Sequence, residues 1–268
     1  MNSVVFGAKL LTFVADKFSV LLQKNQLDTF DKVWNYQVNW FEEPNERRGG
    51  WSGVGRIELQ QTDGAKIGGF LKKQDKHCRT SFLHPIRGVP TFQREFEMMQ
   101  YLANCGINAP EVMFFSRNPN GDLKTTLLTK ELAGFVPLEE LTERMFSKGR
   151  ASLTQQRQVI KAVAALARQL HAAKVQHRSF YPKHLFVKLT NNELPQVAVI
   201  DLEKSRINPF SVMRSLIDLA VLNRHAKYWS KSRRMYFYLQ YLGLKQLTPY
   251  AKWLCRLIVK RSNRVKRK

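Results

Sequence analysis

The chain has 268 residues and carries 44 Lys and Arg against 21 Asp and Glu, a formal net charge of +23. A hydrophobic fraction of 44% predicts a folded globular protein, and the positive charge favours polyanionic partners such as nucleic acid, anionic lipid or phosphorylated sugar. Three cysteines, an odd number without metal-ligand spacing, suggest neither a disulfide framework nor a zinc site, and they fit a reducing cytoplasm.

The N-terminal segment is expected to be an amphipathic helix. Apolar residues recur at helical spacing through residues 3–24, and such a helix would lie on the protein body or on a membrane. Lys9, Asp16 and Lys17 interrupt every apolar run, and no basic region precedes a small-residue cleavage site. We therefore expect neither an export signal nor a transmembrane span.

The first half of the chain reads mainly as strands. Short aromatic and β-branched runs between residues 34 and 71 are separated by "NERRGGWSGVG" and "QTDGAKIGG", which predicts an antiparallel sheet. The run "TFQREFEMMQYLANCG" predicts a helix that ends at Gly106. Two more strands, "EVMFFSR" and "KTTLLTKEL", are expected to flank the turn "NPNGD".

From Leu153 onward the pattern is mainly helical, with Ser152 or Thr154 as the first cap. The chain ends in "KRSNRVKRK", a basic run that is either a solvated end or a binding site. A strand-rich first half and a helix-rich second half predict an α+β protein with two unlike lobes.

Three features of the first lobe suit phosphoryl transfer, which requires held phosphates, bridging metal ions and an aligned acceptor hydroxyl. Gly50, Gly53 and Gly55 would let backbone N–H groups approach phosphates, although three glycines can equally form a turn. Lys72, on a predicted strand, would point toward the α- and β-phosphates. A carboxylate in the following helix, Glu95 or alternatively Glu97, would pair with its ammonium group.

The second lobe contains a loop with the spacing of a kinase catalytic loop. Protein kinases have His, Arg and Asp there, with a metal-binding Asn five residues after the Asp. In "HRSFYPKHLF" these places hold His177, Arg178, Ser179 and His184. Asp201, which ends the apolar run "QVAVID", is a candidate ligand for magnesium or a turn cap. The order of these motifs predicts a protein-kinase-like fold.

The sequences "RRGGWSGVGR", "HRSFYPKHLFV" and "VIDLEKSR" resemble the lipopolysaccharide kinase superfamily, which includes the Kdo kinases and the WaaP heptose kinases, and within it the InaA branch. The resemblance implies a bilobal kinase-like fold, with a small β-rich N-lobe containing one key helix (residues 1–132) and a larger helical C-lobe (residues 133–268). It also implies transfer of the ATP γ-phosphate to a sugar hydroxyl of the lipopolysaccharide inner core in Gram-negative bacteria.

The resemblance further implies roles for individual residues. Lys72 would hold the phosphates and residues 129–132, with Glu131, would form the hinge beneath the adenine. Asp201 would hold Mg²⁺ together with His184, since relatives also have His at that place. Ser179 departs from the pattern, because active relatives have Asp there to orient the acceptor hydroxyl.

Without that carboxylate, two other residues could take its role, and two functions remain possible for the chain. Glu203 could replace it, or could be a surface partner of Lys204 or Arg206, and His177 could act if the loop is rearranged. The chain is then either a lipopolysaccharide core kinase or a pseudokinase that binds nucleotide, lipid or protein. Charge alone supports nucleic-acid binding, and no recognition motif accompanies it. Nothing in the sequence indicates the oligomeric state.

We expect a cytoplasmic protein, peripheral to the inner membrane. Clustered basic residues attract an anionic surface, and the C-terminal third has many of them. Interleaved apolar residues could enter the membrane interface or could pack the helical lobe instead: Trp229, Tyr236, Tyr238, Trp253 and Leu257.

Overall fold

The computed structural model describes residues 12–41, 43–47, 49–81, 84–120, 123–147, 151–190 and 194–264. The chain divides into two compact units. The strand-rich unit comprises Met1–Ala103 and Pro110–Ala133, and the helical unit comprises Asn104–Ala109 and Gly134–Lys268.

The strand-rich unit is built on a six-stranded antiparallel sheet with the order β1-β7-β8-β4-β3-β2. The strands are β1 (Thr12–Val14), β2 (Asn45–Arg47), β3 (Gly50–Gln60), β4 (Lys66–Asp75), β7 (Val112–Arg117) and β8 (Thr125–Lys130). The long hairpin of β3 and β4 is paired from Trp51 and Asp75 to Gln60 and Lys66. A separate pair, β5 (Cys78–Ser81) and β6 (His84–Pro90), leads into the main helix of this unit.

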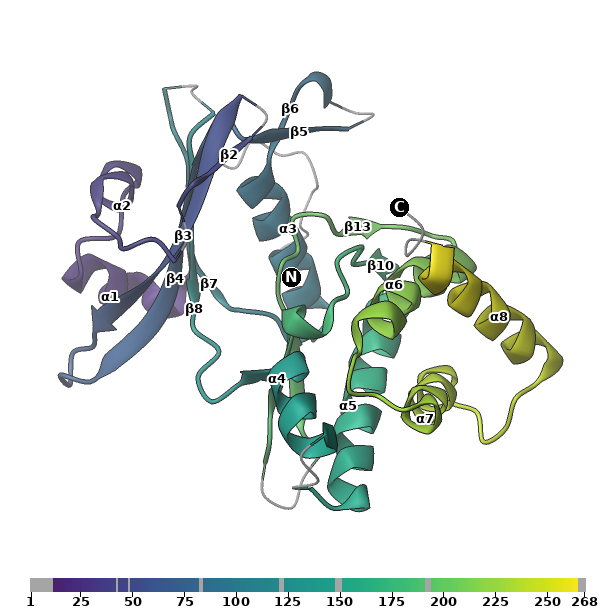
Figure 1. Ribbon diagram of the computed structural model, residues 1–268. Helices are drawn as coiled ribbons and strands as arrows, with labels where there is room; N and C mark the ends of the chain where they lie inside the picture. The colour runs from purple at the N-terminus through teal and green to yellow at the C-terminus, as the bar shows by residue number, and fades with distance from the viewer. Residues whose placement is uncertain are drawn as a thin grey trace. The chain divides into compact units, whose positions relative to one another are not determined.

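Helices cover both faces of this sheet (Figure 1). On one face, α1 (Ser19–Lys24) and α2 (Phe30–Asn35) complete a hydrophobic core that includes Leu22, Val33 and Phe114. On the other face, α3 (Thr91–Asn104) stacks Phe96 on Phe115, with ring centroids 4.2 Å apart. The neighbours Phe114 and Phe115 serve opposite faces because successive strand side chains alternate.

The expectation of one N-terminal helix over residues 3–24 is wrong for its described part. Residues Thr12–Val14 pair with the edge of β7, and the helix is confined to Ser19–Lys24. Hydrogen bonds to β7 satisfy the backbone groups of this segment. The helical spacing of its apolar residues gave no sign of this distant partner. Residues 3–11 lie outside the described residues.

The helical unit contains five α-helices and short strands in its described part (Figure 1). The helices are α4 (Leu138–Thr142), α5 (Leu153–Ala172), α6 (Ser211–His225), α7 (Lys231–Leu242) and α8 (Pro249–Arg264). The strands are β9 (Val136–Pro137), β10 (Val175–Gln176), β11 (Leu185–Lys188), β12 (Gln196–Val199) and β13 (Arg206–Ile207). They form two small antiparallel sheets, β12-β11-β9 and β10-β13.

Local signals explain the limits of these helices. The Ser152 side chain accepts a hydrogen bond from Gln155 N–H, and the Gln155 side chain returns to Ser152 N–H, so a capping box begins α5. Gly243 ends α7 in the left-handed conformation, with φ of 69°. The prediction of an α+β protein is confirmed.

Candidate active site

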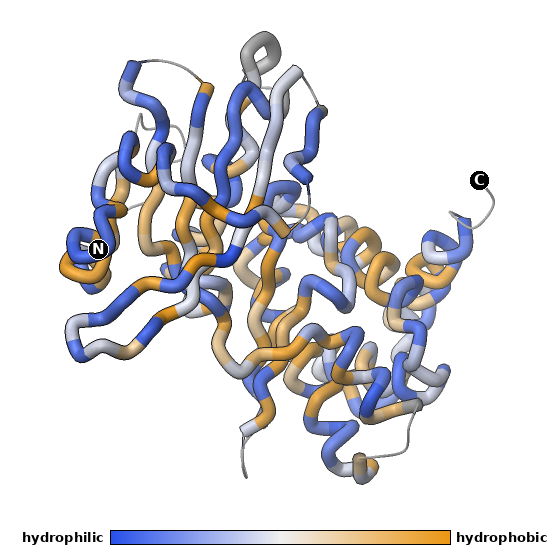
Figure 2. The backbone as a smooth tube through the Cα atoms, turned by 60° about the vertical axis from the view of Figure 1, so that its left-hand side comes forward, coloured by the Kyte–Doolittle hydropathy of each residue, from blue (hydrophilic) through white to orange (hydrophobic). Residues whose placement is uncertain are grey.

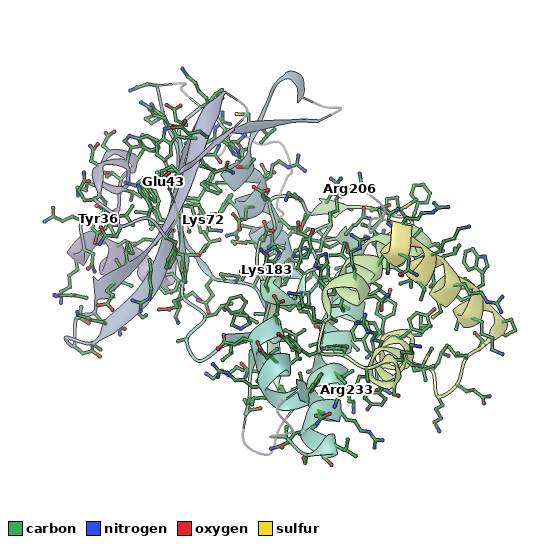
Figure 3. The ribbon with its side chains drawn as sticks, viewed as in Figure 1. Tyr36, Glu43, Lys72, Lys183, Arg206 and Arg233 are labelled. Atoms are coloured by element: carbon green, nitrogen blue, oxygen red, sulfur yellow. The ribbon has the colours of Figure 1, made fainter. Side chains whose placement is uncertain are left out.

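Lys72 forms a well-shielded ion pair with Glu95 inside the strand-rich unit. Its Nζ atom lies 2.7 Å from Glu95 Oε1, and the side chains are 16% and 3% exposed. Figure 3 labels Lys72 on β4, and Glu95 is one turn into α3. The alternative carboxylate, Glu97, instead accepts a hydrogen bond from Gln93 at 2.8 Å. The pair fixes the lysine ammonium between the sheet and the helix.

The glycines expected in a phosphate-binding loop lie within strand β3: Gly50, Gly53 and Gly55. At Gly55 a Cβ atom would come 2.4 Å from the Val38 side chain, and at Gly50 one would meet the Asp75 carbonyl oxygen at 2.1 Å. The structure thus places these glycines in a strand rather than in a loop between strands, and their contact with nucleotide phosphates stays a prediction. Because glycine has no side chain, neighbouring segments of the protein pack closely against β3 at these positions.

Glu131, expected in the hinge, follows β8 and forms an ion pair with Arg56. The Arg56 guanidinium donates to both Glu131 carboxylate oxygens, at 2.9–3.1 Å. Glu131 N–H also donates to the Gly68 carbonyl oxygen at 2.9 Å, and a Cβ atom at Gly68 would overlap the Glu131 carboxylate. The Glu131 side chain thus packs over β4, and its contacts connect the residues after β8 to β3 and β4.

In the helical unit, Asp218 of α6 holds the catalytic-loop backbone. Its carboxylate is fully buried and accepts the N–H groups of His177 and Arg178, each at 2.7 Å. Arg178 has φ of 66°, an unfavourable backbone conformation for a residue with a side chain. His171 Nε2 lies 3.1 Å from the same carboxylate and His171 Nδ1 lies 2.7 Å from Tyr241 Oη. The loop is consequently held by a buried polar network.

Asp218 and the network around it were not predicted from the sequence. The only signal was an aspartate inside the apolar run "SLIDLA", where a buried carboxylate needs hydrogen-bond donors. Those donors lie 40 and 41 residues earlier in the chain. A buried carboxylate can be recognised from such a run, but its partners cannot.

His177 and Ser179, which we expected to be catalytic, are both buried in this loop. His177 Nε2 donates to the Ile200 carbonyl oxygen at 3.0 Å, and its Nδ1 accepts Ser179 N–H at 3.2 Å. Burial lowers the pKa of His177, so the ring stays neutral. Ser179 is 1% exposed, and its Oγ has no hydrogen-bond partner among the described residues. In this conformation neither polar group is open to a sugar acceptor, and the catalytic role expected of both residues stays a prediction.

His184 and Asp201 lie side by side. His184 Nδ1 is 3.1 Å from Asp201 Oδ2 and 2.9 Å from the Ser179 carbonyl oxygen. Both neighbours are acceptors, so Nδ1 carries the proton and Nε2 is the nitrogen left for other contacts. Burial lowers the pKa of His184, which keeps the ring neutral. His184 therefore orients the Asp201 carboxylate through Nδ1 rather than binding a metal with that atom.

Asp201, the expected magnesium ligand, presents a partly exposed carboxylate. It lies two residues after β12, with φ of 60°, and its side chain is 27% exposed. Mg²⁺ commonly takes one or two protein carboxylates and completes its shell with substrate phosphates and water. Within the described residues there is no cluster of three or more His, Cys, Asp or Glu side chains suited to a metal ion. A single carboxylate is thus enough only when a nucleotide supplies further oxygens.

The possible substitute carboxylate, Glu203, has a surface partner. Its Oε1 lies 3.7 Å from Lys204 Nζ, and the two side chains are 23% and 43% exposed. Such a loose pair contributes little to stability, so the carboxylate can turn toward another partner.

The C-terminal aromatic residues do not share one environment. Trp229 and Tyr238 are buried and line a cavity of about 440 Å³ between α6, α7 and α8. These two side chains therefore pack the helical lobe, the second of the two alternatives considered, whereas Trp253 is 46% exposed. In the described ranges, no helix combines the length and apolarity needed to cross a bilayer, and Figure 2 shows hydrophilic residues interrupting the helices.

Comparisons with known proteins agree on one family. The family model described as "Lipopolysaccharide kinase (Kdo/WaaP) family" matches residues 31–241. Protein InaA of Escherichia coli (strain K12) is 31% identical over 180 residues, which cover 67% of this chain and 79% of that protein. A solved structure titled "WaaP in complex with acyl carrier protein" is 19% identical, with a TM-score of 0.65 over 94% of this chain and 99% of that chain.

The likeness to WaaP identifies the fold as bilobal and protein-kinase-like, with the antiparallel sheet in one lobe and the helices in the other. The family model covers most of the described chain, including Lys72, Glu95, the catalytic loop and Asp201. The chain belongs to the lipopolysaccharide kinase (Kdo/WaaP) family.

Proposed function

We propose that this protein is an ATP-dependent kinase that phosphorylates a sugar hydroxyl, of heptose or Kdo, in the lipopolysaccharide inner core. Membership of the lipopolysaccharide kinase family supports this class of reaction. The observation that carries the proposal is the shielded ion pair of Lys72 and Glu95, at 2.7 Å. A lysine held this way by a helix carboxylate is the arrangement that kinases use to bind nucleotide phosphates.

Each retained residue has a defined part in the proposed reaction. Lys72 would hold the phosphates of ATP, and Glu95 would keep its ammonium group in place. Asp201 would hold Mg²⁺, which supplies charge neutralisation at the phosphates when it is bound. His184 would orient the Asp201 carboxylate through its Nδ1–H. Asp218 would keep the loop backbone in its strained conformation.

In the reaction itself, the acceptor oxygen forms a bond to the γ-phosphorus while the bond from that phosphorus to the bridging oxygen of ADP breaks. The hydroxyl proton leaves to a base or to solvent. Ser179 offers no base here, because its hydroxyl is buried. Glu203, with its loose partner Lys204, is the carboxylate that we assign to this step. Loss of a positioned base typically costs about 10²–10⁴ in rate.

The burial of Ser179 also supports an alternative, a pseudokinase that binds nucleotide or lipid without transferring phosphate. One experiment separates the two functions. Purified protein is incubated with γ-labelled ATP, Mg²⁺ and core oligosaccharides that end in heptose or in Kdo. Transfer of label to a sugar, lost in Asp201→Asn, supports the kinase. Nucleotide binding without any transfer to either acceptor supports the pseudokinase.

We also propose a cytoplasmic protein that is peripheral to the inner membrane. Support comes from the net charge of +23 and from a membrane-embedded acceptor. Fractionation of cells tests the location, because a peripheral protein sediments with inner membranes and is released by a salt wash. Recovery in the soluble fraction at low salt would contradict it.

A further inference from the structure

The segment from Arg206 to Met213, here called the apolar segment, exposes three large hydrophobic side chains within seven residues. Phe210 is 71% exposed, Met213 is 43% exposed and Ile207 is 40% exposed. The segment contains β13 and the first turn of α6. Phe210 is the N-cap residue of that helix, and Met213 lies in its first turn. Several large apolar side chains exposed within one short segment are a feature of interaction surfaces.

Buried hydrogen bonds hold the apolar segment in this conformation. Asn208, 6% exposed, donates its backbone N–H to the Lys174 carbonyl oxygen at 2.8 Å and its side-chain amide to Gln176 Oε1 at 3.1 Å. Its Oδ1 accepts Phe210 N–H at 3.0 Å, and its carbonyl oxygen accepts from Arg214 at 2.5 Å.

Fully buried Gln176 binds the segment at two further points. Its Oε1 accepts from Arg206 Nε at 2.8 Å, and its Nε2 donates to the Met213 carbonyl oxygen at 3.4 Å. The hydrophobic effect favours burial of a free phenylalanine. A backbone pinned on both sides of Phe210 prevents that collapse, so the side chain stays available to a partner.

The charge around the segment indicates which partner it meets. Arg206, labelled in Figure 3, and Lys174 are exposed beside the apolar residues. From Lys204 to the end of the chain there are 17 Lys and Arg and one acidic residue, the buried Asp218, a formal charge of 17 − 1 = +16. Apolar side chains flanked by cations match the boundary between anionic headgroups and acyl chains in a bilayer.

We propose that the apolar segment inserts Phe210, Ile207 and Met213 into an anionic membrane, with Arg206 at the headgroups. The segment begins five residues after Asp201, and Ser205 Oγ donates to the His177 carbonyl oxygen at 3.3 Å, so it is continuous with the catalytic loop. This anchor rests on the proposed function in one respect only. It would hold the loop at the surface in which a lipid-linked acceptor lies.

The test is sedimentation of the full chain with vesicles that contain neither acceptor nor ATP. Vesicles of phosphatidylcholine and phosphatidylglycerol in a 3:1 ratio are compared with pure phosphatidylcholine. We expect binding to the anionic vesicles and a loss of about tenfold in affinity in Phe210→Ser, equivalent to about 1.4 kcal/mol. Ile207→Ser should also weaken binding, which provides a second variant if the first does not fold. The matched control is Leu153→Ser, since Leu153 is 69% exposed elsewhere in the helical unit.

Three outcomes would overturn the proposal. They are no binding by the parent protein, equal binding by the parent and both segment variants, and equal loss in Leu153→Ser. Binding that persists in both segment variants and disappears at high salt would assign membrane association to charge alone. The proposed kinase function fails separately, when the parent protein transfers no phosphate to soluble core oligosaccharide whether or not it binds vesicles.

Discussion

Lys72 Nζ lies 2.7 Å from Glu95 Oε1, although the two residues are 23 positions apart and belong to different elements. We expect Lys72→Met to weaken ATP binding at least tenfold and to lower the free energy of unfolding by about 3 kcal/mol, because it leaves a buried carboxylate unpaired. Calorimetry with ATP and chemical denaturation measure the two effects. The control is Lys66→Met on the same strand, whose lysine is 61% exposed and pairs with Glu58. Equal effects of both variants would refute a special role for Lys72.

Ser179→Asp tests why the loop lacks an acidic residue. If the loop can turn that side chain outward, phosphoryl transfer should rise by about tenfold or more, within the range of general-base contributions. Initial rates with labelled ATP and core oligosaccharide measure the change, with Ser179→Asn as the uncharged control. A fall in rate with unchanged thermal stability would show that this position is not an open catalytic site.

Asp218→Ala should be the most destabilising substitution in the catalytic loop's surroundings. It removes the acceptor of two buried backbone N–H groups, at His177 and Arg178, so a loss on the order of 3 kcal/mol is expected. Thermal and urea unfolding measure the loss. Glu139→Ala is the control, because Glu139 forms only a partly exposed pair with Lys227 at 3.4 Å. Similar stability of the two variants would contradict the anchoring role.

Because of Lys73, the free energy of unfolding should change with pH in the alkaline range. This residue is 5% exposed, its Nζ donates to the carbonyl oxygens of Trp34 and Tyr36, and burial lowers its pKa from 10.5 to about 8. Between these two pH values the unfolded chain holds a proton that the native protein has released. The free energy of unfolding should therefore rise with pH in this window, by at most about 3 kcal/mol.

The measurement is urea unfolding of the parent and of Lys73→Met at pH 7.5 and at pH 10. Other groups titrate in both proteins, so the difference between the two proteins isolates Lys73. We expect the parent to gain stability relative to the variant as the pH increases. A difference that stays constant with pH would mean that the native lysine keeps its proton through its two carbonyl acceptors.

Gly55→Ala tests the role of the glycines in β3. A Cβ atom at Gly55 would come 2.5 Å from the Asn39 carbonyl oxygen, so we expect a loss of stability of about 1–3 kcal/mol from overpacking. Nucleotide affinity should be unchanged in the fraction that remains folded. Ser52→Ala on the same strand is the control. Weaker ATP binding with normal stability would instead support the expected role of the glycines in nucleotide binding.

Much of the fold follows from local patterns in the sequence. The capping signal at Ser152 and the glycine ends of α3 and α7 depend on residues within one helical turn, so their neighbours in the chain suffice. The strands of the long hairpin carry alternating buried and exposed residues, which is likewise a local pattern. Thr12–Val14 formed a strand despite its helical spacing because a distant partner, β7, pairs with it.

The candidate site divides in the same way. The types of residue and their order predicted Lys72, its helix carboxylate, the loop around His184 and Asp201, because kinase chemistry requires those groups in that order. Only the tertiary structure decided between Glu95 and Glu97 as the partner of Lys72. It also showed that Ser179 is buried and that the Asp218 carboxylate binds the loop backbone. Burial and hydrogen-bond satisfaction depend on groups brought together from distant parts of the chain, and no local pattern encodes which groups those are.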